Sequence, residues 1–341
     1  MKRLLLIVVV LSFLVSCQNK ESKPVEEEEI VENPVHVYDH EISFGDEFPL
    51  EGYLSYSEDF EGPLPAVILV HGSGANDRNS AVGGTRIFED IAHALAAEGI
   101  ATLRYDKRTF SYSREIVMSD KFSSFTVQEE TIDDVLLAKA FLLEHPMIDS
   151  TRIFILGHSM GGMLAPKIHS QSSFAGIIML AGTPRSMIDV LVSQSEDVLL
   201  TVENEFEKKQ ILQGMELIES IKYMTEEESK NLNLSSIYGY YLLDFERYDT
   251  LTILENLEVP ILIMQGTDDF QVKVERDYHL YVDALSNKEN INFKLYEGLN
   301  HLFMVSGGEH QYTVQEYDAE NYVDETVLED IIEFIKAYEA K

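Results

Sequence analysis

A serine stands between two glycines in the sequence GHSMG at 157–161. The apolar run Ile153–Leu156 precedes this segment and a helical pattern follows it, so Ser159 falls on a strand-to-helix turn. Flanking glycines permit a tight turn that lifts the hydroxyl out of the sheet and places it at the positive end of the helix. This context predicts that Ser159 is a nucleophile, although the same pattern can mark a turn that merely needs glycine.

A serine nucleophile needs a base, and the base needs an acid that orients it. His301 follows the apolar run Ile291–Tyr296, and the adjacent carboxylates Asp268 and Asp269 follow the run Pro260–Met264. The sequence therefore offers a base and an acid after two predicted strands. From the residues alone, either aspartate could be the acid.

Two other histidines compete with His301 for the role of base. His279 lies in a predicted helix, where a surface or packing role is expected. His310 follows a glycine pair and could reach a cleft, so it stays open as an alternative.

The elements that must position these side chains form an alternating series. Residues 35–56 alternate between polar and apolar, which predicts an N-terminal antiparallel hairpin. Beyond it, short continuous apolar runs alternate with helical patterns, as in a parallel sheet buried on both faces. The expected strands are Ala66–Val70, Ala101–Tyr105, Ile153–Leu156, Gly176–Leu180, Pro260–Met264 and Ile291–Tyr296. The expected helices are about Thr85–Glu98, Thr126–Glu144, Met160–His169, Val274–Ser286 and Glu325–Tyr338.

One stretch departs from this alternation. Residues 184–256 contain no convincing strand and are charged and helical in pattern, most clearly from Glu203 to Ser220. An insertion of this size predicts a helical cap that covers the site and shapes substrate access. The whole pattern predicts an α/β fold with a mostly parallel, doubly wound sheet.

The N-terminus has the pattern of an export signal. Lys2 and Arg3 precede the apolar run Leu4–Val15, and the run ends at Cys17, which is the one cysteine of the chain. This end resembles the lipobox of bacterial lipoproteins, so we expect residues 1–17 to be a signal peptide and Cys17 to carry the lipid. An ordinary signal peptide or an uncleaved anchor is the alternative.

The N-terminal pattern implies how the rest of the chain is organised. Residues 18–33 are a polar, acidic tether, and residues 34–341 form the catalytic domain. We therefore expect an exported protein held on a bacterial membrane. The formal net charge of -34 repels phosphate backbones and argues against nucleic-acid binding. A cysteine used for anchoring leaves no thiol for a disulfide or for a cysteine-based metal site.

Five segments resemble the α/β-hydrolase superfamily, and within it the EstD-like bacterial carboxylesterases, near the prolyl oligopeptidase and serine aminopeptidase groups. They are HGSGANDRN at 71–79, GIATLRYDKR at 99–108, GHSMGG at 157–162, PILIMQGTDDFQV at 260–272 and GLNHLF at 298–303. The family pattern Q-G-x-x-D-x-x-V places Asp269 in the acid position with Val272 in register, which leaves Asp268 as a solvated loop residue. Ala75 stands where relatives often carry proline.

The resemblance also implies an oxyanion hole and a reaction. The amides of Met160 and of Ser73 or Gly74 are expected to hold the tetrahedral oxygen. His71 is expected to be structural. The residues Arg104, Asp106, Lys107 and Arg108 are expected to form an ion-pair network with Asp77 or Arg78 rather than to touch substrate.

The implied activity is hydrolysis of short-chain carboxylic esters through a Ser-His-Asp triad and an acyl-enzyme, without metal or cofactor. A serine peptidase acting on short peptides would use the same triad and is the first alternative. A ligand-binding lipoprotein on an inactive hydrolase scaffold is the second.

Overall fold

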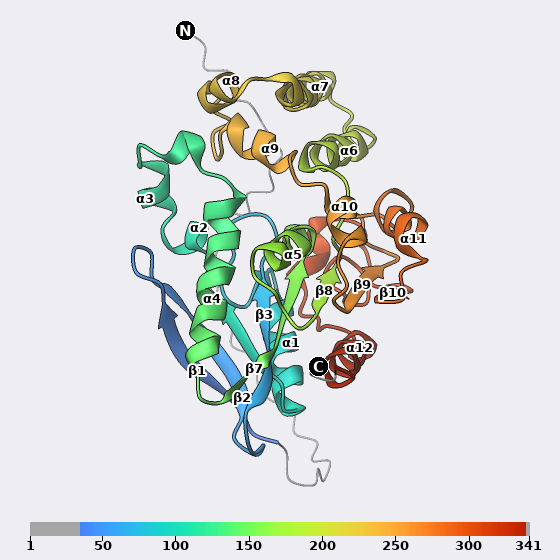
Figure 1. The fold of residues 1–341 in the computed structure, drawn as a ribbon. Coiled ribbons are helices and arrows are strands. Elements are labelled where there is room, and N and C mark those ends of the chain that lie inside the picture. Colours follow the sequence, from blue (N-terminus) through green and yellow to red (C-terminus); the bar gives the residue numbers. More distant parts are fainter. Residues whose placement is uncertain (1–34, 339–341) are drawn as a thin grey trace, which may run out of the picture.

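The computed structural model describes residues 35–338, and an eight-stranded sheet forms its centre (Figure 1). The strand order is β1-β2-β6-β3-β7-β8-β9-β10. The β1–β2 and β2–β6 pairs are antiparallel, and the other neighbours are parallel. The predicted fold class is confirmed. The strands are β1 Val37–Phe44, β2 Leu50–Ser57, β3 Leu64–Val70, β6 Ala101–Tyr105, β7 Ile148–His158, β8 Ile177–Leu180, β9 Ile261–Gly266 and β10 Ile291–Tyr296.

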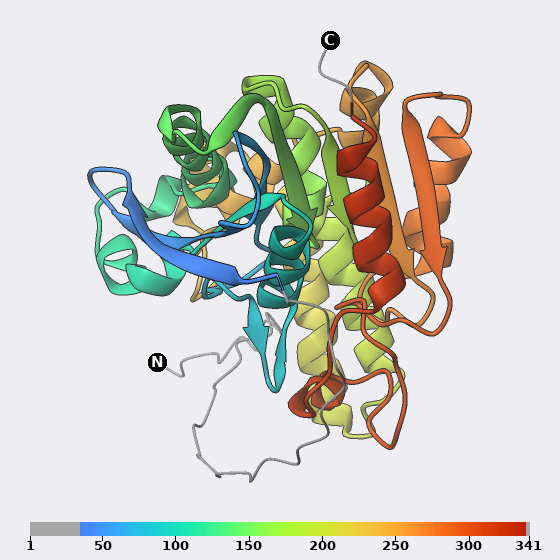
Figure 2. The same cartoon turned by 90° about the horizontal axis from the view of Figure 1, so that it is seen from below.

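Successive side chains of the strands point to opposite faces of the sheet, and an apolar core covers each face. In β3, Ala66, Ile68 and Val70 belong to one apolar core, while Val67 and Leu69 belong to the other. Helices α1 and α12 cover the second core, and α4, α5 and α11 cover the first (Figure 2). These helices are α1 Ile87–Ala97, α4 Asp133–Glu144, α5 Met160–Gln171, α11 His279–Leu285 and α12 Glu325–Lys336.

Two expected helices begin differently from the prediction. The first begins at Ile87, because Thr85–Arg86 forms a short strand, β5, that pairs with β4, Ala81–Val82. The second opens with a π-helical turn, Gln128–Ile132, before α4. At this start the Glu129 carboxylate accepts from the Thr126 amide at 2.9 Å, and the Thr126 hydroxyl oxygen accepts from the Gln128 amide at 3.2 Å. Two small helices, α2 Arg108–Ser111 and α3 Ser113–Val117, lie before it.

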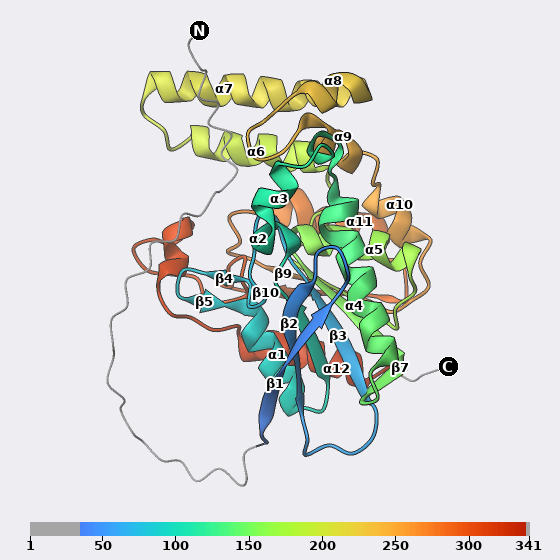
Figure 3. The same cartoon turned by 90° about the vertical axis from the view of Figure 1, so that its left-hand side faces the viewer.

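Helices α6 to α9 form a layer beyond one end of the sheet (Figures 1 and 3). The chain enters this layer from the carboxyl end of β8 and returns through α10, which packs against α5. Ile218, Tyr241 and Phe245 of the layer belong to the same apolar cluster as one face of the sheet. The bounds are α6 Met187–Leu199, α7 Glu205–Ser220, α8 Glu226–Asn231, α9 Gly239–Phe245 and α10 Thr250–Glu255.

The predicted signal peptide, the acidic tether and the lipidation site Cys17 lie outside the described residues. Among residues 35–338, no helix combines the length and apolar character needed to cross a membrane.

Close backbone packing at the antiparallel junction gives a first prediction. A Cβ at Gly52 of β2 would lie 2.3 Å from the carbonyl oxygen of Arg104. Gly52→Ala should therefore lower the free energy of unfolding by about 2 kcal/mol or more, as measured by urea titration. Gly214→Ala in α7 is the matched control, because a Cβ there meets no heavy atom within 4 Å. The control should leave stability unchanged or raise it by up to about 1 kcal/mol, and equal stabilities of both variants would contradict the account.

Candidate active site

Ser159 lies on the turn between β7 and α5 with φ 55° and ψ -120°, a conformation that is strained for a residue with a side chain. Both flanking glycines are required by close packing. A Cβ at Gly157 would lie 2.1 Å from the Gly161 carbonyl oxygen, and a Cβ at Gly161 would lie 2.2 Å from the carbonyl oxygen of Val70. The turn is thus pressed against the carboxyl end of β3, and Ser159 itself stays partly exposed.

The surroundings of Ser159 suit an oxygen that gains negative charge. Ser159 is the N-cap of α5, and no backbone carbonyl among residues 35–338 accepts a hydrogen bond from the Met160 amide. Gly72 lies directly beside the serine, since a Cβ at that position would be 3.6 Å from Ser159 Oγ. A free amide at a helix start therefore adjoins the hydroxyl.

The Asp269 carboxylate and the His301 ring are hydrogen-bonded, with 2.7 Å between Asp269 Oδ2 and His301 Nδ1. Both side chains are buried. The same Oδ2 accepts from Gln265 Nε2 at 2.9 Å, and Oδ1 accepts from the amides of Gln271 and Val272 at 2.8 and 2.9 Å. Four donors hold this carboxylate, so its position and its charge are stabilised without a cation.

His158 connects this pair to the nucleophile turn. Its Nε2 donates to the carbonyl oxygen of His301 at 2.8 Å, and the two rings lie 4.8 Å apart between centroids. Because His158 directly precedes Ser159, the His301 ring and the serine lie at the same edge of the sheet. The residues described include no hydrogen bond from Ser159 to the His301 ring, and such bonds often tighten only when substrate binds.

The loop of residues 72–74 is held through its carbonyl groups. Asn76 Nδ2 donates to the carbonyl oxygens of Gly72, Ser73 and Gly74 at 3.1 to 3.3 Å, and Lys107 Nζ donates to those of Gly72 and Gly74 at 3.0 Å. Gly74 has φ 90°, which favours glycine there. No backbone carbonyl in residues 35–338 accepts from the amides of Ser73 and Gly74, so both remain available to a ligand.

The alternative acid, Asp268, and the alternative bases, His279 and His310, do not join the hydrogen-bonded pair of Asp269 and His301. Asp268 is half-buried and accepts from Gln311 Nε2 at 3.0 Å and from the Tyr312 hydroxyl at 3.2 Å, so it is bonded to the loop after β10 rather than solvated as predicted. His279 is exposed on α11, and His310 is exposed in the loop after β10. Neither ring makes a hydrogen bond with Asp269 in the part of the chain that is described.

The basic and acidic residues around position 106 form the expected ion pairs in part. Asp106 accepts from the backbone amide of Arg78 at 2.8 Å and from its guanidinium at 2.6 Å, so the pairing with Arg78 is found. Asp77 does not join the network; its carboxylate accepts from two backbone amides of its own loop. The remaining pairs are Arg104 with Asp39, Arg108 with Asp134 and Lys107 with Glu130.

Three residues beside the site, Gln265, Glu130 and Tyr241, had no role predicted from the sequence, and Lys107 pairs with Glu130 rather than within the expected network. Gln265 donates to the Asp269 carboxylate, and its place in the Q-G-x-x-D pattern was a usable signal. Lys107, Glu130 and Tyr241 form a buried group behind the loop of residues 72–74, which is called the oxyanion loop below. They come from three distant parts of the chain, so no local pattern marks them as neighbours.

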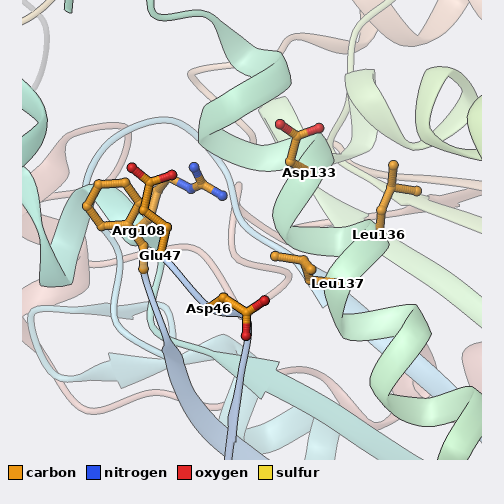
Figure 4. Close-up of a pocket in the computed structure, with 7 residues that line it drawn as sticks. Asp46, Glu47, Arg108, Asp133, Leu136 and Leu137 are labelled. Atoms are coloured by element: carbon orange, nitrogen blue, oxygen red, sulfur yellow. The ribbon is translucent and has the colours of Figure 1, made fainter. Parts of the chain in front are cut away.

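A surface pocket of about 450 Å³ lies between the β1–β2 turn and α4 (Figure 4). None of Ser159, Asp269 and His301 lines it, and the guanidinium of its one arginine is already paired with Asp134. The lining residues are Asp46, Glu47, Phe48, Arg108, Asp133, Leu136 and Leu137. The described residues contain no group of three or more His, Cys, Asp or Glu side chains that could hold a metal ion.

Two histidines at the site are buried and neutral. Burial, with the nearby positive charge of Lys107, lowers the pKa of His71 to about 3. Burial, with the neighbouring His301, lowers the pKa of His158 to about 3. In each ring Nδ1 is buried without a hydrogen-bond partner, so a second proton would be a desolvated charge.

This fold and this site define an α/β hydrolase. Residues 63–306 match the family described as serine aminopeptidase, S33, and the chain belongs to that family.

The chain is also similar to an esterase. It is 35% identical over 270 residues to esterase EstD of Thermotoga maritima. The aligned segment covers 79% of this chain and 61% of that protein. The chain therefore spans about three fifths of the length of this curated relative. The resemblance to EstD-like proteins is confirmed at the level of family.

Solved structures share the fold at low sequence identity. The Pyrococcus furiosus esterase Pf2001 has a TM-score of 0.52 at 16% identity, covering 94% of this chain and 99% of that one. Est1E from Butyrivibrio proteoclasticus has a TM-score of 0.56 at 17% identity, with 88% and 99% covered. An acylaminoacyl peptidase from Pyrococcus horikoshii has a TM-score of 0.55 at 15% identity, covering 89% of this chain and 42% of that one.

The depressed pKa of His71 predicts loss of stability in acid. The ring is ordinarily half-protonated near pH 6.5, whereas the folded protein holds it neutral down to about pH 3. Between these values the unfolded chain binds a proton on His71 that the folded chain does not bind. The free energy of unfolding therefore has its full value above pH 6.5 and decreases as the pH falls toward 3. His71→Gln should reduce the slope of unfolding free energy against pH in this window by roughly 1 kcal/mol per pH unit.

The measurement is denaturant unfolding of both chains between pH 4 and pH 7. Other titrating groups are common to both chains and cancel in the comparison. Identical slopes would show that His71 titrates normally in the folded protein.

Proposed function

We propose that this chain is a serine carboxylesterase that hydrolyses short-chain carboxylic esters with Ser159 as nucleophile, His301 as base and Asp269 as orienting acid. The observation that carries the proposal is the buried 2.7 Å bond between His301 and Asp269, beside the strained turn that bears Ser159. A base fixed by a fully bonded carboxylate next to a partly exposed serine is the arrangement that acyl transfer requires.

The reaction would proceed in two halves. Ser159 Oγ attacks the ester carbonyl carbon while His301 Nε2 accepts the hydroxyl proton, and the C–O bond to the alcohol then breaks as His301 returns that proton to the leaving oxygen. A water molecule next attacks the acyl carbon while His301 accepts its proton; the bond from that carbon to Ser159 Oγ then breaks, His301 returns the proton to Oγ, and the acid leaves. In both halves the amides of Met160 and of Ser73 or Gly74 would stabilise the oxyanion.

A serine aminopeptidase is the second candidate, because that name describes the matched family. An aminopeptidase needs a free carboxylate for the substrate's terminal ammonium. The buried acid behind the oxyanion loop is Glu130, and both of its oxygens are already engaged, Oε1 by Lys107 at 2.9 Å and Oε2 by the Tyr241 hydroxyl. Glu130 therefore has no free oxygen for a substrate ammonium group, which favours an uncharged ester as the substrate. The similarity to an esterase points the same way.

The choice between these activities is tested by comparing two substrates. Wild-type protein should turn over p-nitrophenyl butyrate with a kcat/KM at least about 100-fold above that for alanine p-nitroanilide, a gap of roughly 3 kcal/mol in activation free energy. His301→Ala should lower kcat on the ester by about 10³-fold or more, given how triads respond to loss of the base. His310→Ala is the matched control and should retain activity.

Faster turnover of the anilide would replace the esterase by the peptidase. A mild effect of His301→Ala with a large effect of His310→Ala would move the base to His310.

The N-terminal pattern supports a second part of the proposal, export and lipid anchoring at Cys17. Cys17→Ser should abolish incorporation of radiolabelled palmitate in a bacterial host and release the protein from the membrane fraction. Retention of both label and membrane association in this variant would overturn the anchor.

A further inference from the structure

A buried lysine lies behind the oxyanion loop. Lys107 is 1% exposed and its ammonium donates to the carbonyl oxygens of Gly72 and Gly74 at 3.0 Å each. Its third partner is Glu130 Oε1 at 2.9 Å. The loop is thus bonded to a cation whose own charge is compensated by the Glu130 carboxylate.

The direction of these bonds determines where the loop's amides point. A peptide unit is planar and trans, so a carbonyl and the following N–H point in opposite directions. Holding the Gly72 carbonyl toward Lys107 therefore turns the Ser73 amide away from the lysine. Asn76 binds the Ser73 carbonyl at 3.1 Å and turns the Gly74 amide in the same manner. The loop thus has its carbonyls fixed behind it and its amides free.

A second set of contacts connects this lysine to the cap. Glu130 lies in the π-helical turn before α4, and a local widening of this kind redirects a side chain. Its Oε2 accepts from the hydroxyl of Tyr241, which belongs to α9. Burial and the Glu130 carboxylate raise the pKa of Tyr241 well above its ordinary value, so the hydroxyl stays a donor.

The same tyrosine also reaches the other half of the oxyanion hole. Its hydroxyl lies 3.6 Å from Met160 Sδ, and Met160 bears the amide at the start of α5. Tyr241 therefore contacts the side chain of Met160 directly and is connected to the loop of residues 72–74 through Glu130 and Lys107.

We propose that Lys107 is a positioning residue for the oxyanion hole and that Glu130, itself bonded by Tyr241 of the cap, holds the lysine in place. This inference rests on the proposed esterase function. Lys107 touches no reacting atom; through the Gly72 carbonyl it fixes the peptide unit that carries the Ser73 amide, while Asn76 fixes the unit that carries the Gly74 amide. Loss of Lys107 should weaken binding of the tetrahedral state more than binding of the planar ester.

The test compares Lys107→Met with wild type and with Lys336→Met, a control that removes an exposed lysine paired with Glu98. On p-nitrophenyl butyrate, Lys107→Met should lose about 10² in kcat with KM changed less than about threefold, as for loss of an oxyanion donor. The inhibition constant of phenylboronic acid, which forms a tetrahedral adduct with serine, should rise in parallel. Lys336→Met should match wild type in kcat, in KM and in the inhibition constant of phenylboronic acid.

Tyr241→Phe keeps the experiment decisive if the lysine variant does not fold. It removes one hydroxyl with little change of volume and should lower kcat by about tenfold, again with KM nearly constant. Wild-type kcat and boronate affinity in a folded Lys107→Met, or in Tyr241→Phe when the lysine variant is unfolded, would overturn the inference alone. A wild-type chain inactive on esters and unreactive toward a fluorophosphonate would overturn the proposed function and this inference with it.

Discussion

The strained turn at Ser159 is the constraint on which the rest of the site depends. A residue with φ 55° and ψ -120° persists only where its surroundings leave no alternative, and here the backbone of the turn is packed against the end of β3. Glycine on both sides is the condition for that packing. The strain is retained because it holds a hydroxyl at the start of a helix and beside a loop of free amides.

Satisfied polar groups surround this turn and make it rigid. The Asp269 carboxylate accepts four hydrogen bonds, and the ammonium of Lys107 donates to two carbonyls and is ion-paired with Glu130. Buried charges of this kind are tolerated only when fully bonded, and they then define one geometry. The His301 ring and the loop of residues 72–74 are therefore both fixed by neighbouring polar groups, Asp269 for the ring and Asn76 and Lys107 for the loop.

Much of the fold and of the candidate site could be predicted because the signals are local. A strand buried on both faces is a continuous apolar run, and the turns that carry Ser159, Asp269 and His301 directly follow such runs. The choice between Asp268 and Asp269 was not local and came from family register. The Lys107–Glu130–Tyr241 group could not be predicted, since it joins residues 107, 130 and 241 through a π-helical turn and a cap contact that no periodicity records. The short β4–β5 pair was missed because two-residue strands carry no pattern.

The central claim is that the hydroxyl of Ser159 is activated by the base held on Asp269. It is tested most directly by treating the folded protein with a fluorophosphonate and locating the adduct by peptide mass spectrometry. The account predicts one adduct, on the peptide containing Ser159, that is absent in Ser159→Ala and forms at least about 100-fold more slowly in His301→Ala. Equal labelling of wild type and Ser159→Ala would contradict it.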